Sequence, residues 1–461
     1  MPDFALANLS VGQSMTMAPL GALYVMAALD EAGCSVFFQD YALEQGLDLY
    51  SVERITRFLD IADSPILGIS CFSSMLPYAV AAAQRLRETR PSIKIVLGGP
   101  GPSAVGKDLM EVFTAIDFVV YGEGEETAIE LASSLKTGAP QLSAIQGLIW
   151  RASDGTVVRT PPRRRRKELD EIHFPAYERV NLADYDIVGL VYARGCPYEC
   201  TYCDVVSMWK RQNVARSLQN VLTEIAWLKE RFGVRHVAFV DDLFTVDRNR
   251  TLRFCREFQR LHGDATWGCT TRIDRMDTAL IDEMARAGCN YVFYGVESGS
   301  AKILARVNKV IPFEQTAAMV KSSVQREIYV HTPLMWGFPF EDLNDFRETL
   351  VFGQYLEHCG AHVFYTMATP LPATALYEEY RERLAFDAET YSAIVGYGGA
   401  EGLRDVESII RSYPHLFPGF YHFAEGLIAE KIRIGRSKGL NLSDIRISNL
   451  AARERAASVE Y

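Results

Sequence analysis

The chain has 461 residues, of which 48% are hydrophobic and 23% charged, and its formal net charge is −10. This length predicts two or three domains, and the composition is that of an ordinary globular protein. The negative charge argues against a general nucleic-acid binder, and no apolar run reaches the roughly 18 residues of a membrane span. Since no basic stretch followed by an apolar one opens the chain, we expect no export signal and a cytoplasmic location.

Strands and helices alternate over residues 1–145. The predicted strands are Phe4–Leu9, Ser35–Gln39, Ile66–Cys71, Ile93–Leu97 and Phe118–Tyr121, and the predicted helices are Leu20–Ala32, Pro77–Thr89 and Glu126–Leu135. Such alternation predicts a parallel, doubly wound sheet, which binds ligands beyond the carboxyl ends of its strands. The loops that we expect at a ligand are therefore Ser70–Pro77, Gly98–Ser103 and Gly122–Glu125.

Residues 146–186 are polar and proline-containing, and they predict a linker. They include a basic run, Arg163-Arg164-Arg165-Arg166-Lys167, directly after Pro161-Pro162. A run of this kind can contact phosphate or nucleic acid. Because the surrounding domains are acidic, we expect a solvated linker instead.

Three cysteines follow an apolar run, Ile187 to Ala193, which predicts a buried strand. Cys196, Cys200 and Cys203 have the spacing C-x3-C-x2-C on the loop that leaves this strand. Three thiolates can hold three irons of a [4Fe–4S] cube and leave the fourth iron open. The alternative is a structural zinc site, but no Cys or His follows within a few residues to complete a tetrahedron. The other cysteines are scattered and predict reduced core residues: Cys34, Cys71, Cys255, Cys269, Cys289 and Cys359.

Six strand–helix units span residues 187–385. The predicted strands are Ile187–Ala193, His236–Val240, Thr266–Thr271, Tyr291–Gly295, Val330–Trp336 and His362–Met367. The helices between them are Leu218–Arg231, Asn249–Leu261, Thr278–Arg286, Phe313–Arg326 and Leu343–Glu357. Polar or glycine-containing groups follow successive strands: Asp241-Asp242, Arg272, Gly295-Val296-Glu297-Ser298-Gly299 and Gly337-Phe338-Pro339. In a barrel built of such units, chemistry belongs at these strand ends.

The cysteine motif, with Tyr202 before its last cysteine, resembles the signature of the radical SAM superfamily. Gly295–Gly299 is similar to the family's G-[IV]-E-S-G, and Thr369–Pro372 to a phrase common in its cobalamin-type members. The loops of the first 130 residues, with Pro19-Leu20-Gly21, resemble the cobalamin-binding domain of the same group. The resemblance implies an α/β fold: a Rossmann-like domain over residues 1–145, a partial (β/α)6 TIM barrel over 187–385, and a small helical extension over 386–461.

The resemblance also implies roles for individual residues. Cys196, Cys200 and Cys203 would bind the cluster, and S-adenosylmethionine (SAM) would lie beside Tyr202. Asp241 and Asp242 would meet the SAM amino group, Arg272 its carboxylate, Glu297 and Ser298 its ribose and methionine, and Gly337 its adenine. The residues themselves allow plainer interpretations, because the two aspartates could sit at a helix N-terminus and Arg272 could pair with Asp274 or Asp277.

Several aromatic and histidine side chains near the strand ends and in the tail have two possible interpretations. Tyr192, Tyr198, Trp209, Trp336 and Tyr365 could shape a substrate pocket, but packing is the default. His331 and His362 are expected to be core histidines. In residues 386–461 we predict a helix at Ala424–Ile434 and frayed last residues, with Tyr413, His415, Tyr421 and His422 as candidate substrate contacts.

Cobalamin binding is left open by the residues. The D-x-H-x-x-G motif is absent, Gly99–Ser103 lacks the histidine that relatives often carry, and residues 1–172 contain no histidine at all. The alternative is a Rossmann-like scaffold without a corrinoid. A dinucleotide is disfavoured because no G-x-G-x-x-G follows the first strand.

The resemblance implies an enzyme that cleaves SAM reductively to a 5′-deoxyadenosyl radical, which removes hydrogen from a small organic substrate, with natural-product biosynthesis as the expected setting. A one-electron donor such as flavodoxin or ferredoxin would be its partner, with no nucleic acid or membrane involved. Cobalamin-dependent C-methylation is the favoured outcome. A cobalamin-independent radical dehydratase or epimerase of an aminoglycoside-like sugar and a non-catalytic Fe–S protein are the alternatives.

Overall fold

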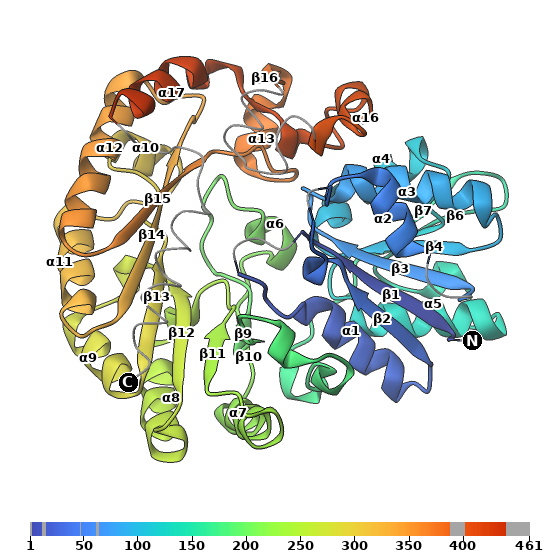
Figure 1. Cartoon of the computed structure of the whole chain (residues 1–461), viewed down its shortest axis with the longest axis horizontal. Coiled ribbons are helices and arrows are strands. Elements are labelled where there is room, and N and C mark those ends of the chain that lie inside the picture. Colours follow the sequence, from blue (N-terminus) through green and yellow to red (C-terminus); the bar gives the residue numbers. More distant parts are fainter. Residues whose placement is uncertain (1, 12–14, 47, 61–63, 388–401, 439–461) are drawn as a thin grey trace. The chain divides into compact units, whose positions relative to one another are not determined.

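A computed structural model describes residues 2–11, 15–46, 48–60, 64–387 and 402–438, which form two compact α/β units (Figure 1). The first unit comprises Met1–Lys167, Glu171–Tyr185 and Tyr397–Tyr421, and the second comprises Glu168–Asp170, Asp186–Gly396 and His422–Tyr461. Each unit is built around its own sheet. The predicted pair of folds, a Rossmann-like domain and a partial barrel, is confirmed.

The first unit contains a seven-stranded sheet of order β2-β1-β3-β4-β5-β6-β7. Its parallel strands are β1 (Phe4–Leu9), β2 (Val36–Asp40), β3 (Ile66–Cys71), β4 (Lys94–Gly98) and β5 (Phe118–Val120). Five helices connect or flank them: α1 (Leu20–Glu31), α2 (Val52–Leu59), α3 (Leu76–Thr89), α4 (Pro100–Val112) and α5 (Glu125–Thr137). The carboxyl ends of β1, β3, β4 and β5 therefore share one edge, as the sequence predicts.

Two stretches differ from the sequence prediction in this unit. The expected loop Gly98–Ser103 runs directly into α4, because Pro100 occupies the first turn of the helix, where proline is tolerated. Part of the expected linker forms β6 (Leu148–Arg151) and β7 (Val157–Arg159), which extend the sheet with antiparallel pairing. Leu148 and Ile149 are fully buried, so this hairpin contributes to the core of the unit.

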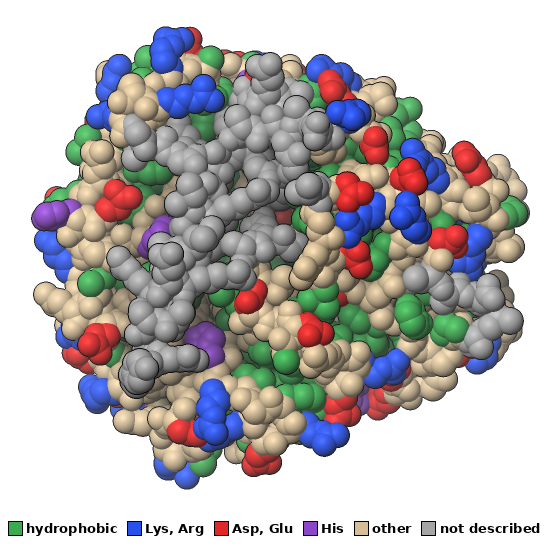
Figure 2. Space-filling model, viewed as in Figure 1, with side chains coloured by type: hydrophobic (Ala, Val, Ile, Leu, Met, Phe, Trp, Pro, Cys, Tyr) green, Lys and Arg blue, Asp and Glu red, His purple; other side chains and the backbone are tan. Residues whose placement is uncertain are grey.

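The prediction of a solvated basic run holds for Arg164 and Lys167, which are exposed, but not for the other three arginines, which are partly buried and paired. Arg163 Nη1 lies 2.7 Å from Glu126 Oε2, Arg165 Nη1 lies 3.1 Å from Glu123 Oε1, and Arg166 also pairs with Glu126. The acidic partners lie around the N-terminus of α5, where carboxylates are favoured, and they draw the arginines onto the unit. Figure 2 shows basic and acidic side chains side by side over the face in view.

The segment from Gly402 to Tyr421 packs on the first unit, far from it in sequence. The Tyr78 hydroxyl donates to the Gly402 carbonyl at 2.8 Å, and the Val52 amide at the start of α2 donates to Asp405 Oδ2 at 2.9 Å. Tyr413, next to α16 (Glu407–Ser412), contacts the ring of Phe113 at 5.3 Å between centroids. Tyr413 therefore packs in the first unit, and the Tyr421 hydroxyl donates to the Ile410 carbonyl at 3.0 Å.

The second unit contains a six-stranded parallel sheet of order β15-β14-β13-β12-β11-β8, the half-barrel of Figure 1. Its strands are β8 (Gly189–Leu190), β11 (His236–Phe239), β12 (Thr266–Thr271), β13 (Cys289–Tyr294), β14 (Tyr329–Trp336) and β15 (His362–Met367). The main covering helices are α7 (Leu218–Phe232), α8 (Arg248–His262), α9 (Thr278–Arg286), α11 (Phe313–Val324) and α12 (Leu343–His358), with the shorter α10 (Ala301–Arg306) between α9 and α11. The predicted succession of six strand–helix units is confirmed.

The expected first barrel strand is broken in two. After β8 the chain kinks and forms β9 (Ala193–Arg194), which pairs antiparallel with β10 (Val214–Ala215). The Asp241 carboxylate accepts from the Tyr192 and Ala193 amides at 2.8 and 2.9 Å, so it takes the place of a strand neighbour there. No helix in the described part of the chain is long and apolar enough to cross a membrane.

Candidate active site

The three cysteines lie on the loop between β9 and α6 (Val205–Trp209), and all three are free and partly buried. Burial raises the pKa of Cys196 and raises that of Cys203 to about 12, and the neighbouring cysteine sulfurs add to both shifts. Three mutually repelling thiolates in a half-buried loop need nearby cations. The donor set therefore fits iron, which is bound by deprotonated thiols.

The cysteine motif supplies three ligands, one fewer than a tetrahedral zinc site needs. Among the residues that the structure describes, no group of three or more His, Cys, Asp or Glu side chains could hold one metal ion. A tetrahedral zinc site would need such a group. In an iron–sulfur cube each thiolate binds a different iron, so the thiolates need not converge on one point. A loop that supplies three cysteines is therefore compatible with a cluster.

The aspartates after β11 brace the cysteine loop from its N-terminal side. Asp241 is 3% exposed and accepts the two amides named above, and Asp242 Oδ2 accepts from the Gly195 amide at 2.8 Å. Burial raises the pKa of Asp241 to about 7. The helix that follows is capped by Asp247, not by this pair, so the helix-terminus interpretation was wrong.

Arg272, at the end of β12, reaches the cysteine loop. Its Nη1 lies 3.5 Å from Cys200 Sγ, and its guanidinium carbon lies 3.8 Å from the centre of the Tyr198 ring. Nε and Nη2 donate to the two carboxylate oxygens of Asp274 at 2.9 and 3.0 Å. Arg272 therefore pairs with Asp274 and also lies beside the cysteines. Its Nη1 atom is the one directed at the cysteines.

A second charged group joins the cysteine loop to the end of β13. Glu297 is 7% exposed, and its Oε1 lies 2.6 Å from Lys309 Nζ. The Tyr202 hydroxyl also hydrogen-bonds with Glu297; burial first, and then this carboxylate, raise the pKa of Tyr202 well above its usual value. A Cβ on Gly295 would lie 2.6 Å from Glu297 Oε1 and 2.7 Å from Lys309 Nζ, so only glycine leaves room for the pair. Tyr202, Glu297 and Lys309 thus form one buried network.

Sequence reasoning missed Lys309. It lies outside the strand-end motifs, beyond α10, and becomes visible only because the chain folds back onto Glu297. An isolated lysine in a loop gives no periodic or spacing signal. Its 5% exposure, unusual for lysine, is the structural sign that it belongs to the site.

The remaining predicted cofactor residues also lie at strand ends. Ser298 is fully buried, its Oγ is 2.9 Å from Thr349 Oγ1, and it accepts from the Ser300 amide at 3.1 Å. Gly337 follows β14 with φ of 87°, and its amide donates to Glu341 Oε2 at 2.6 Å. Ser298 therefore orders the turn after β13, and the Glu341 side chain holds the turn at Gly337.

Most of the other candidate side chains pack in the core. Tyr192 contacts Phe239, Phe244 and Phe254, while Trp336 is fully buried against Phe346, which confirms the packing interpretation for both. His422 lies in β17 and its Nδ1 is 3.1 Å from the Phe423 carbonyl.

The two histidines expected in the core lie beside each other. The rings of His331 and His362 are 5.0 Å apart, and His331 Nδ1 is 3.1 Å from the Tyr291 hydroxyl. Burial lowers the pKa of His331 to about 4, so this imidazole is neutral. His331 Nε2 has no hydrogen-bond partner among the described residues.

The loops at the carboxyl edge of the first sheet expose apolar side chains. Phe72, directly after β3, is 56% exposed, and Met17, between β1 and α1, is 41% exposed. Because β1 and β3 are parallel neighbours, both side chains lie at one edge of the sheet. An apolar surface beside glycine-rich turns fits a large, flat ligand such as a corrin ring.

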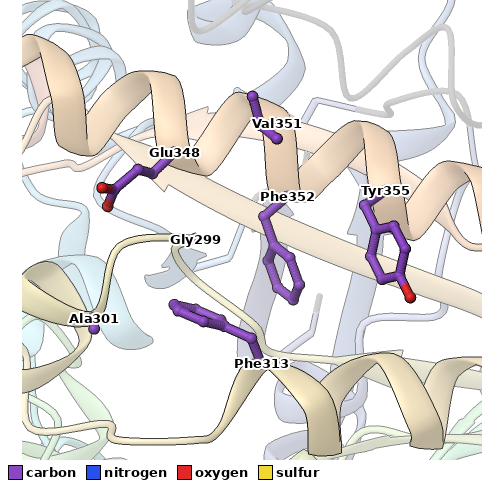
Figure 3. A pocket seen from close by; sticks show the side chains of 7 residues that line it. All are labelled: Gly299, Ala301, Phe313, Glu348, Val351, Phe352 and Tyr355. Atoms are coloured by element: carbon purple, nitrogen blue, oxygen red, sulfur yellow. The ribbon is translucent and has the colours of Figure 1, made fainter.

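A separate hollow of about 550 Å³ lies on the outer, helical layer of the barrel (Figure 3). It is lined by Gly299, Ala301, Phe313, Glu348, Val351, Phe352 and Tyr355, and the Phe313 and Phe352 rings are 5.0 Å apart between centroids. None of the predicted cofactor residues lines it. We therefore place the candidate active site at the strand ends and not in this hollow.

Comparison with known proteins gives two domain matches. Residues 13–132 match the B12 binding domain, and residues 190–353 match the radical SAM superfamily. An uncharacterised methyltransferase of Pyrococcus horikoshii is 28% identical over 78% of this chain and 78% of its own length. The anaerobic magnesium-protoporphyrin IX monomethyl ester cyclase of Rubrivivax gelatinosus is 25% identical over 75% of this chain and 63% of its own length.

A solved structure is similar over both units. The radical SAM methyltransferase TsrM from Kitasatospora setae, solved with cobalamin and a [4Fe–4S] cluster, has a TM-score of 0.66 at 20% identity and covers 86% of this chain and 76% of its own. A radical SAM domain implies a [4Fe–4S] cluster and SAM, and a B12 binding domain implies cobalamin. The chain therefore carries a B12 binding domain followed by a radical SAM domain.

Proposed function

We propose that the protein is a cobalamin-dependent radical SAM methyltransferase that methylates a carbon atom of a small organic molecule. The observation that carries this proposal is the presence, in one chain, of a B12 binding domain and a radical SAM domain whose cysteine loop is complete. The methyltransferase name of the Pyrococcus relative supports the same reaction class. The dehydratase and epimerase alternatives gain no support from these relatives.

Cys196, Cys200 and Cys203 are the residues that would hold the cluster, which when bound supplies the electron for SAM cleavage. The chain itself fixes the loop. Asp241 and Asp242 accept three backbone amides at its start, and Tyr202 anchors it to Glu297. Rigid support of this kind keeps ligands in place when the cluster charge changes.

SAM is zwitterionic, and the strand ends offer complementary groups. Arg272 Nη1, with its two neighbouring N–H groups already held by Asp274, presents a positive edge to the SAM carboxylate next to Cys200. Glu297, Ser298 and Asp242 lie on the strand ends that would face the amino group and the ribose. Lys309 neutralises Glu297 in the ligand-free protein, so we add it to the residues of this site.

Gly337 is the residue proposed at the adenine. Its positive φ turns the backbone after β14, and its neighbour Phe338 is fully buried, so the turn is held firmly. Backbone groups recognise adenine without any charge, so this contact requires no ionic side chain.

Cobalamin would bind at the carboxyl edge of the first sheet, against the loops that carry Met17, Phe72 and Gly122. Residues 1–172 contain no histidine, so this domain offers no imidazole to the lower face of the cobalt. Residues 1–172 would therefore contribute apolar surface and backbone contacts to cobalamin, and no imidazole ligand.

Anaerobic turnover with methyl-labelled SAM, a one-electron donor such as flavodoxin, and a small-molecule extract of the native host tests the proposal. We expect label in the product, with S-adenosylhomocysteine and 5′-deoxyadenosine formed together. Unlabelled product, 5′-deoxyadenosine as the sole SAM product, and full activity without cobalamin would reject methyl transfer and leave the radical dehydratase or epimerase.

A further inference from the structure

A fully buried ion pair connects the C-terminal helix α17 (Ile428–Ser437) to the turn after β14. Lys431 Nζ lies 2.5 Å from Glu341 Oε2, and neither side chain is exposed to solvent. The same ammonium donates to the Glu341 backbone carbonyl at 3.1 Å. Lysine and glutamate are almost never fully buried unless they are paired, so this contact constrains where α17 can lie.

Glu341 also makes a second contact, because the oxygen that accepts from Lys431 accepts a hydrogen bond from the Gly337 amide. That hydrogen bond is 2.6 Å long and spans the turn proposed at the adenine. Burial raises the pKa of Glu341 and lowers that of Lys431. Each group therefore keeps its charge because the other is present, and without Lys431 the carboxyl that holds Gly337 is left as an unpaired buried acid.

The backbone ahead of α17 covers the same turn directly. A Cβ on Gly426 would lie 2.7 Å from the Gly337 carbonyl oxygen, and a Cβ on Gly337 would lie 3.0 Å from Ile428 Cδ1. Gly426 is therefore needed for this approach, and the φ of 87° at Gly337 also favours glycine. The turn is enclosed by Glu341 on one side and by residues 426–428 on the other.

The C-terminal segment is tied to the cysteine loop through one hydrophobic cluster. Phe423 and Phe338 belong to this cluster, and Tyr202 packs against it. Phe423 lies in β17 (His422–Phe423), which pairs antiparallel with β16 (Leu384–Ala385) and so brings the chain back to the barrel. A displacement of α17 would thus reach both the Gly337 turn and the Tyr202 side of the cysteine loop.

We propose that Lys431 is a positioning residue for SAM: it holds Glu341 and, through it, the Gly337 turn in the geometry that receives the adenine. The inference rests on the proposed function, because it places the adenine of SAM at Gly337. Docking of α17 and binding of SAM are then thermodynamically coupled. Because such coupling is reciprocal, a change that loosens α17 weakens SAM binding, and bound SAM in turn stabilises the docked α17.

Three variants of the full-length, cluster-loaded protein test the proposal by anaerobic SAM titration. Lys431→Met should weaken SAM binding about tenfold, within the usual range of coupling between two sites. The double variant Glu341→Gln/Lys431→Met should recover most of this loss, because an amide oxygen accepts from Gly337 without a counter-charge. Arg433→Met removes an exposed cation from the same helix and should leave the dissociation constant unchanged.

Hydrogen exchange of the unsubstituted protein gives a measurement that does not depend on any variant folding. Adding SAM should slow amide exchange across residues 428–437. Unchanged exchange in that helix, or a Lys431→Met protein that binds SAM as tightly as its parent, would overturn the role of Lys431. Failure of the cluster-loaded parent itself to bind SAM would instead overturn the proposed function, so the two failures are distinguishable.

Discussion

Replacing Arg272 by alanine should weaken SAM binding while the iron and sulfide content stays the same. Asp274 occupies Nε and Nη2, so Nη1, 3.5 Å from Cys200 Sγ, is the donor available to a SAM carboxylate. Losing one charge-assisted hydrogen bond costs on the order of 1.5–3 kcal/mol. That corresponds to roughly a ten- to 150-fold higher dissociation constant.

The fold should tolerate this change. The Asp274 side chain that loses its partner is 27% exposed, so water can solvate its charge. The measurement is an anaerobic titration of the reconstituted protein with SAM. Arg275→Ala is the matched control, because Arg275 is an exposed arginine of the same turn that contacts the Tyr198 hydroxyl. An unchanged dissociation constant in Arg272→Ala, or equal weakening in Arg275→Ala, would refute the reasoning.

Three further predictions concern the cluster, the loop and the cobalamin. Replacing Cys196, Cys200 and Cys203 together by alanine should abolish cluster iron, whereas Cys34→Ala should not; four irons in the triple variant would contradict the assignment. The pKa of Asp241 is raised above its ordinary carboxyl value, so its contribution to stability falls as the pH rises towards about 7. We therefore compare the melting temperatures of the unsubstituted apoprotein and of Asp241→Asn. The value for the apoprotein minus the value for the variant should be larger at pH 5 than at pH 8. A difference that does not change with pH would count against this prediction. Bound cob(II)alamin should show no nitrogen coupling from the protein in its electron paramagnetic resonance spectrum, and such coupling would show that a histidine from elsewhere reaches the cobalt.

The fold and the strand-end residues could be predicted because their signals are local. Alternation of apolar strands and amphipathic helices fixes a parallel sheet, and the polar group after each strand then falls at one edge. The cysteine spacing lies within eight residues, so its chemistry is visible without any tertiary information. Thr266–Thr271 and His362–Met367 have the same bounds in the sequence prediction and in the structure.

The features that sequence reasoning missed depend on contacts between distant residues. Lys309 and Lys431 become site residues only when the chain brings them to Glu297 and Glu341. At the break between β8 and β9 the free backbone amides are satisfied by Asp241, which comes much later in the chain. Three arginines of the run expected to be solvated are paired because α5 places acidic residues opposite them, and charge composition alone cannot reveal such partners. The glycine-rich segment at 397–401 and the last residues lie outside those that the structure describes.

The most direct test of the central claim needs no knowledge of the substrate. The protein is reconstituted anaerobically with iron, sulfide and hydroxocobalamin, freed of unbound cofactor, reduced, and incubated with methyl-labelled SAM. A cobalamin-dependent methyltransferase predicts retained cobalamin that acquires the labelled methyl group while S-adenosylhomocysteine accumulates. Loss of all cobalamin on gel filtration, with SAM converted solely to 5′-deoxyadenosine and methionine, would contradict the claim.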